Sequence, residues 1–276
     1  MTKNIVILAG GASTRMKKSS NKNLSPEKIF QANHVSKGLI EFGGRPFLSD
    51  LLDNILKAGF KNVYIITGEN SKIFRKSFKN NPNFNQLKIK FATQYIYEKR
   101  DKPYGTADAL YQCLEQYPNL KTDKFCVCNS DNLYSTKAFR MLRDTKQSQA
   151  ILAYDIDYLK YAKERISGFA VMRFNKFYDL LDIVEKPELE KIANYRDDIR
   201  KIRVSMNIFL FDGKYFFKFL KNCPPHPIRD EKEIPTALSN MINDNIKVIG
   251  IPIAEHVPDL TSKGDIIELE KFLRRE

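Results

Sequence analysis

The chain has 276 residues, and 46 Lys and Arg stand against 33 Asp and Glu, so its formal net charge is +13 at pH 7. Hydrophobic residues make up 42% of it and aromatic residues 12%, which supplies a packed core and excludes a globally disordered chain. No run of about 18 consecutive apolar residues occurs, and this excludes a transmembrane helix. The opening MTKNIVILAGG also lacks the long apolar core and cleavage site of a signal peptide, so we expect a cytoplasmic protein with no membrane partner.

The positive charge is spread along the chain and interleaved with acidic residues, without a run of five or six basic residues. A solvated, Lys-rich surface explains such a distribution, and no recognition module for nucleic acids is visible. We therefore expect no nucleic-acid partner. Steep salt-dependent binding to duplex DNA would reverse this expectation.

The four cysteines form no CxxC pair and lie near no pair of histidines. Zinc sites need closely spaced ligand pairs, so we expect no zinc, and disulfides are not expected in a reducing compartment. Cys126 and Cys128 alternate along KFCVCN, which predicts two small apolar side chains that face one side of a strand.

Strands and helices alternate along the first half of the chain. Short β-branched runs predict buried strands at residues 4–9, 61–67, 88–93, 124–129 and 149–156. Amphipathic stretches between them predict helices, as in FLSDLLDNILKAG, TADALYQCLEQY and KAFRMLRDT, and Gly59 is suited to end the first of these. Repeated strand–helix units of roughly 30 residues predict a Rossmann-like, doubly wound α/β fold with a mostly parallel sheet.

The second half of the chain is less regular. GFAVMRF, YDLLDIVE and RVSMNIFLF predict short strands that extend the sheet with mixed directions or build a substrate lobe. Helical patterns return at 213–222, 231–243 and 265–274, and Ser262 with Asp265 forms an S-x-x-D capping box for the last helix. Because no internal repeat and no Gly/Ser linker is present, we expect a single domain that spans residues 1–276.

The first strand leads into LAGGASTRM, residues 8–16. This segment matches neither G-x-G-x-x-G nor G-x-x-x-x-G-K-[ST], the two common nucleotide-binding fingerprints. Two glycines at the end of a strand still let backbone N–H groups approach an anion, and the guanidinium of Arg15 suits phosphate oxygens. An ordinary turn with a surface arginine fits these residues equally well.

Six further motifs follow in order: SKGLIEFGGRPFL, TQ with YGTADAL, NSDNLY, SGFAV, DIVEKP and VPDLTSKGD. Together with LAGGASTRM, they make the chain resemble the nucleotidylyltransferases that activate sugar 1-phosphates, such as glucose-1-phosphate thymidylyl- and uridylyltransferases. The resemblance runs from Ile5 to about Leu273. It implies transfer of a nucleotidyl group from an NTP to a sugar 1-phosphate, with Mg²⁺, giving an NDP-sugar and pyrophosphate.

The resemblance also implies roles for particular residues. Residues 1–155 would bind the NTP, and residues 156–276 would bind the acceptor. The matching positions are Arg15 and Lys37 as catalytic clamps of the triphosphate, Asp131 and Asp259 as Mg²⁺ ligands, Leu8, Ala9, Gly10, Gly11, Gln94, Gly105 and Thr106 as nucleotide contacts, and Gly168, Glu185 and Lys186 as acceptor contacts. Charge neutralisation and positioning suit this chemistry, because the attacking phosphate oxygen is already an anion.

Two departures from the family pattern stand out. Residues 17–36 form a longer connection than usual between Arg15 and Lys37, with few apolar residues, so we expect a flap that is mobile without ligand and closes over the triphosphate. A tolerated surface insertion fits these residues equally well. The family's Asn-x-Gly near the sugar reads Ser205-Met206-Asn207 here, and Asn tolerates the left-handed conformation that Gly supplies.

Several alternatives stay open at this point. Transfer to a non-sugar phosphate such as phosphocholine needs aromatic or acidic residues around the quaternary ammonium, and Tyr95, Tyr97, Tyr104 and Tyr134 are candidates. A molybdopterin-type guanylyltransferase shares the GG-x-S-x-R start, but EKP and the C-terminal Asp motif argue against it. A non-catalytic nucleotide-sensing homologue is disfavoured by the intact charged residues. A homo-oligomer is compatible with each of these functions.

Overall fold

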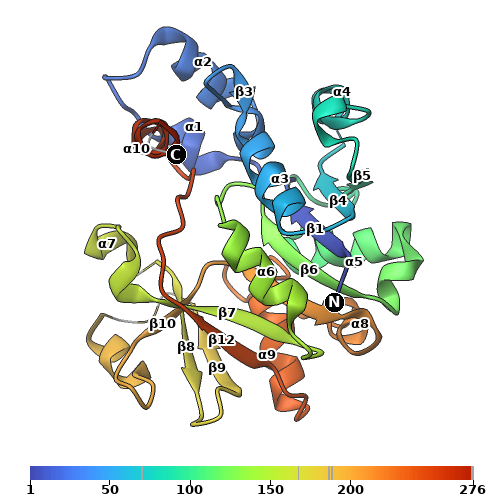
Figure 1. Ribbon diagram of the computed structural model, residues 1–276, viewed down its shortest axis with the longest axis vertical. Coiled ribbons are helices and arrows are strands. Elements are labelled where there is room, and N and C mark those ends of the chain that lie inside the picture. The colour runs from blue at the N-terminus through green and yellow to red at the C-terminus, as the bar shows by residue number, and fades with distance from the viewer. Residues whose placement is uncertain (70, 167, 186, 188, 275–276) are drawn as a thin grey trace.

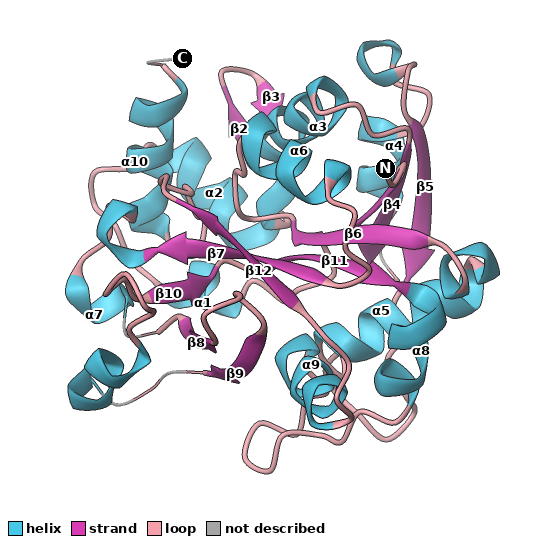
Figure 2. Cartoon of the chain, turned by 60° about the horizontal axis from the view of Figure 1, so that its bottom comes forward, coloured by secondary structure: helices cyan, strands magenta, loops and turns pink. Residues whose placement is uncertain are grey.

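The computed structural model describes every residue of the chain except 70, 167, 186, 188 and 275–276. Its centre is a ten-stranded sheet with the order β5-β4-β1-β6-β11-β7-β10-β8-β9, and β12 pairs with β7 (Figures 1 and 2). The strands are β1 Asn4–Leu8, β4 Asn62–Thr67, β5 Lys88–Thr93, β6 Lys124–Asn129, β7 Ala150–Asp155, β8 Ala170–Phe174, β9 Leu180–Val184, β10 Arg203–Ser205, β11 Ile208–Asp212 and β12 Ile249–Ile253. A small separate hairpin joins β2 Glu41–Phe42 and β3 Arg45–Pro46.

Helices connect these strands and flank the sheet. They are α1 Thr14–Lys18, α2 Pro26–His34, α3 Phe47–Lys57, α4 Lys72–Phe78, α5 Thr106–Gln116, α6 Thr136–Asp144, α7 Lys163–Ile166, α8 Gly213–Lys221, α9 Ile234–Asn243 and α10 Lys263–Leu273. None of the helices described here is long and apolar enough to cross a lipid bilayer.

The sheet separates two apolar clusters, one on each face. Ile5, Ile7, Cys126 and Cys128 join one cluster with the buried residues of α3 and α6, whereas Val6 and Val127 join the other with α5, α8 and α9. This follows from the strand geometry, since alternate side chains point to opposite faces. It also confirms the prediction for Cys126 and Cys128, which are buried and, like the other two cysteines, unpaired.

The predicted Rossmann-like fold is confirmed, with one difference in the pairing. β5, β4, β1 and β6 are parallel neighbours, but β7 does not pair with β6 as a purely parallel sheet requires. Instead β11 lies between them and is antiparallel to both. RVSMNIFLF therefore forms two strands rather than one, and Asn207 lies at the break with a φ of 56°, in the left-handed conformation expected for it.

Residues 17–36 are more ordered than their few apolar residues suggest. The segment forms the end of α1 and all of α2; Leu24 and Ala32 are buried, and Ile29 and Val35 pack against the core. Figure 1 shows these helices in blue beside α10 in red, at the other end of the chain. A C-terminal partner that periodicity alone does not reveal therefore covers the segment. Its closure over an NTP stays a prediction.

Candidate active site

The site lies where the order of the parallel strands reverses. From the adjacent strands β1 and β6, the chain crosses over in opposite directions, to β4 from the first and toward β11 and β7 from the second. Ligands of open α/β sheets bind in the crevice outside the carboxyl ends of the strands at such a point. Here the backbone N–H of Ser130 donates to the carbonyl of Leu8 at 3.1 Å, so the two loops leave the sheet side by side.

A cleft of about 540 Å³ opens between these loops. Its lining contains Arg15, Lys37 and Asp131, together with every predicted nucleotide contact, namely Leu8, Ala9, Gly10, Gly11, Gln94, Gly105 and Thr106. Residues separated by more than 100 positions in the chain are thus brought to one cleft.

An ion pair holds the two charged loops together at the cleft. The ammonium of Lys37, in the short 3-10 helix Lys37–Leu39, donates to Oδ2 of Asp131 at 2.7 Å. Both side chains are largely shielded from water, with 13% and 24% of their surface exposed. Arg15, in the first turn of α1, is exposed and lies in the same lining. The arrangement places two cations and one carboxylate around the space that an anionic ligand would enter.

Asp259, near the C-terminal end of the chain, lies beside the loop that carries Asp131. The backbone N–H of Leu260 donates to the carbonyl of Asp131 at 2.8 Å, and Asn132 forms an isolated β-bridge with Asp259. Burial raises the pKa of the Asp259 carboxyl, and the negative charge of Asp131 raises it further. Arg165 opposes this effect by donating to Oδ2 of Asp259 at 2.7 Å. Two carboxylates therefore converge at the end of β6.

Gln94 is oriented by its neighbours rather than free in a loop. Its Nε2 donates to the carbonyl of Gly105 at 3.0 Å and to Oδ2 of Asp108 at 3.1 Å. Because both partners are acceptors, the amide nitrogen must face them, which leaves the carbonyl oxygen near Gly10 as the group offered to a ligand. Gln94 is 3% exposed, so a ligand would meet a fixed acceptor there.

Residues 231–233, which the sequence predicts to be helical, form a loop on this side of the cleft. The backbone N–H of Lys232 donates to the carbonyl of Tyr104 at 2.7 Å, and that of Ala107 donates to the carbonyl of Lys232 at 2.9 Å. Glu231 and Glu233 line the cleft. The predicted helix 231–243 starts only at Ile234, because Pro235 in its first turn follows an extended Glu233. Pro235 was therefore the residue in the sequence that could have indicated the later start of this helix.

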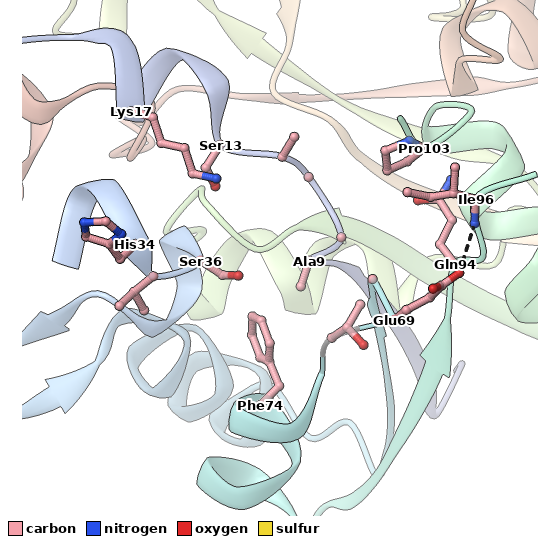
Figure 3. A pocket seen from close by; sticks show the side chains of 16 residues that line it. Ala9, Ser13, Lys17, His34, Ser36, Glu69, Phe74, Gln94, Ile96 and Pro103 are labelled. Carbon is pink, nitrogen blue, oxygen red and sulfur yellow. Dashed lines mark hydrogen bonds between the residues drawn. The ribbon is translucent and has the colours of Figure 1, made fainter. Parts of the chain in front are cut away.

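A second cavity of about 370 Å³ adjoins the first and shares with it the turn Ala9–Ser13 and Gln94. Figure 3 shows Lys17, His34 and Ser36 on one side of it and Glu69, Gln94 and Ile96 on the other. The two cavities form one long depression along the turn after β1. It is large enough for a ligand with several connected groups.

Of the predicted acceptor residues, Gly168 and Glu185 lie outside the lining of either cavity. Gly168 is exposed in the loop after α7. Glu185 follows β9, and its carboxylate pairs with Arg229, which also pairs with Glu233 of the cleft at 2.5 Å. Lys186 lies outside the described residues. The structure thus connects Glu185 to the cleft through Arg229, and it places Gly168 in a separate exposed loop.

Comparison with known proteins identifies the family. The nucleotidyl transferase family matches residues 4–255, nearly the whole chain. The chain belongs to this family. A solved structure of UDP-glucose pyrophosphorylase complexed with UDP-glucose is similar in fold, with a TM-score of 0.73 and 18% sequence identity over 100% of this chain and 99% of that one. The predicted nucleotidyltransferase membership is therefore confirmed, as is the α/β fold.

Proposed function

We propose that this nucleotidyltransferase joins the nucleotidyl group of an NTP to a sugar 1-phosphate and releases pyrophosphate. The observation that carries the proposal is the Lys37–Asp131 pair, at 2.7 Å, beside Arg15 in a cleft at the switch point of the sheet. That pair offers a cation for phosphate oxygens and a carboxylate for a metal at one place. The UDP-glucose in the related structure supports a nucleotide–sugar product.

The reaction is a displacement at the α-phosphorus of the NTP. A phosphate oxygen of the acceptor forms the new bond, and the bond between the α-phosphorus and the bridging oxygen breaks, so that pyrophosphate leaves with the electron pair. The nucleophile is already an anion and needs no general base. Arg15 and Lys37 would lower the repulsion between the reactants and stabilise the charge that develops on the phosphoryl oxygens.

The carboxylates fit a hard divalent cation such as Mg²⁺. Asp131 and Asp259 converge although burial disfavours a second charge at Asp259, and such an acidic pair suits a bound cation with oxygen ligands. When bound, Mg²⁺ would polarise phosphate oxygens and stabilise charge on them. Asp131 and Asp259 would hold it, and Lys37 would orient Asp131.

The acceptor is assigned to the C-terminal half of the chain, residues 156–276. Glu185, next to Arg229, is the group we assign to the sugar hydroxyls, with Gly168 and Lys186 as further contacts. Two of the four tyrosines considered for a choline cage have their surfaces occupied by the protein itself. Tyr134 is fully buried, with its hydroxyl donating to the carbonyl of Met206, and the face of Tyr104 is covered by the guanidinium of Arg100 at 3.8 Å.

Pyrophosphate release tests the function directly. Five NTPs are assayed against several sugar 1-phosphates and phosphocholine, with and without Mg²⁺, and the organic product is identified by mass. We expect release with one NTP and a sugar 1-phosphate, and its loss in Lys37→Met but not in the control Lys57→Met, which alters an exposed residue of α3. Pyrophosphate release only with phosphocholine would show that the acceptor is phosphocholine and not a sugar 1-phosphate. No pyrophosphate release with any pair of NTP and acceptor would refute the proposed function.

A further inference from the structure

Lys263, the first residue of α10, is an unusual lysine because it is only 4% exposed. Its Nζ lies within hydrogen-bond distance of three backbone carbonyls, those of Met16 at 2.9 Å, Lys17 at 3.1 Å and Ser19 at 2.7 Å. An ammonium has three protons to donate, so these acceptors satisfy it fully. A buried charge is tolerated only with such compensation.

These three carbonyls belong to the end of α1, the helix that carries Arg15. α1 has only five residues, so it holds itself together poorly. The backbone N–H of Lys263 also donates to Oγ of Ser19 at 2.9 Å, and that hydroxyl donates to the carbonyl of Met16 at 2.9 Å. The orientation of α1 is therefore set by a residue about 245 positions away in the chain.

The same C-terminal segment is fixed to the carboxylates at its other end. Four residues before Lys263, Asp259 lies in the β-bridge beside Asp131. The backbone N–H of Leu133 donates to the carbonyl of Pro258 at 2.8 Å, which completes this attachment. Residues 258–263 thus run as a short strut from the end of β6 to the end of α1. Figure 1 shows α10 directly beside α1.

We propose that Lys263 is a positioning residue, which fixes α1 and thereby holds Arg15 at a set place relative to Asp131 and Asp259. The inference rests on the proposed function, in which Arg15 clamps the triphosphate. It predicts that Lys263 serves the NTP side of the reaction and not the acceptor side. The contact with Lys263 also explains how Arg15 can keep a fixed position although the long segment 17–36 follows it in the chain.

The test compares Lys263→Met with Lys263→Arg, which keeps a cation, and with Lys271→Met. Lys271 is a matched control because it lies on the same helix, 58% exposed, and pairs only with Glu268 among the described residues. We expect Lys263→Met to lower kcat/KM for the NTP about 10²-fold, the cost of a misplaced clamp, while the acceptor KM stays unchanged. Lys263→Arg should recover part of this loss, and Lys271→Met should show none.

A double-mutant cycle with Arg15→Ala separates positioning from general destabilisation. If Lys263 acts through Arg15, Lys263→Met has little further effect in the Arg15→Ala background. Equal effects in both backgrounds, or an equal rise in the acceptor KM, would overturn the proposal.

Hydrogen exchange in the free protein gives a second readout that needs no activity. Lys263→Met should reduce amide protection in residues 14–19 beyond any change elsewhere, and unchanged protection there would overturn the proposal. If Lys263→Met does not fold, Ser19→Ala takes its place in this measurement, since it removes the hydroxyl that accepts the backbone N–H of Lys263 and so weakens the same attachment. If no NTP and acceptor pair is turned over, the proposed function fails, while the exchange result still decides whether Lys263 fixes α1.

Discussion

The two halves of the molecule prepare their sites in different ways. In the first half, the turn after β1 and the end of β6 meet because parallel strands fix their register, and the Lys37–Asp131 pair closes the gap between them. In the second half, Glu185 is already paired with Arg229, and Gly168 stands apart in an exposed loop. Backbone geometry thus fixes the loops of the proposed nucleotide side. The proposed acceptor side has no such backbone frame, and Glu185 would have to leave Arg229 to bind a sugar hydroxyl.

The substitution with the largest expected effect is Asp131→Asn, which tests the proposed nucleotide side. The change removes the charge that would hold the metal and pair with Lys37, and such charge stabilisation is worth several kcal/mol. We expect kcat to fall about 10³-fold, since each 1.36 kcal/mol is a factor of ten, with the melting temperature little changed. Pyrophosphate release at saturating substrates measures it. Asp144→Asn, on the exposed end of α6, is the control, and wild-type turnover in Asp131→Asn would refute the metal assignment.

The sequence predicts the first half of the site better than the second, because the first half depends on local motifs and the second on tertiary packing. LAGGASTRM and NSDNLY are local strand-to-loop motifs, so their residues arrive at the cleft as soon as the strands pair. Glu231 and Glu233 were missed because only tertiary packing of their loop against Tyr104 and Ala107 brings them there. The position of β11 between β6 and β7 could not be predicted for a similar reason, because the periodicity of a strand does not identify the strands that pair with it.

On the acceptor side, Lys186→Ala tests whether the second half acts independently. Lys186 lies outside the described residues, and the prediction comes from the EKP motif. We expect the acceptor KM to rise and kcat to fall, with little change in the KM for the NTP, because a lost charge-assisted contact costs about 1.5–3 kcal/mol. Lys176→Ala, in the exposed turn between β8 and β9, is the control. An unchanged acceptor KM would remove Lys186 from the site.

The contact between the halves is tested by Gly105→Ala. Gly105 has a φ of 99°, and a Cβ there would lie 2.3 Å from the carbonyl oxygen of Lys232, a backbone atom that cannot move alone. We expect a loss of about 1–3 kcal/mol in the free energy of unfolding from backbone strain, and a raised KM for the NTP as the loop shifts away from Gln94. Gly264→Ala meets nothing closer than 3.7 Å and serves as control. A wild-type KM for the NTP would show that this loop does not shape the nucleotide side.

The smallest expected effect concerns His256, which lies in the C-terminal half, just before the strut that carries Asp259. Burial lowers its pKa to about 4, helped by the positive charges of Lys160 and Arg165. Its Nδ1 accepts the backbone N–H of Lys160 at 3.1 Å, a bond that only an unprotonated Nδ1 can make. The unfolded chain takes up this proton near pH 6.5, whereas the folded chain resists it down to about pH 4. Stability from this residue is therefore complete above about pH 6.5 and is lost as the pH falls toward 4.

Thermal unfolding across that window measures the contribution. We expect the wild-type protein to lose more of its melting temperature between about pH 7 and 4.5 than His256→Gln does, because the glutamine oxygen accepts the same N–H without titrating. His34→Gln changes an exposed histidine of α2 and should behave like the wild type. Since carboxylates titrate in all three proteins, the difference between the curves isolates His256. Parallel curves for the wild type and His256→Gln would mean that this region of the second half adjusts to the charge, and that the strut holding Asp259 is less rigid than its backbone bonds indicate.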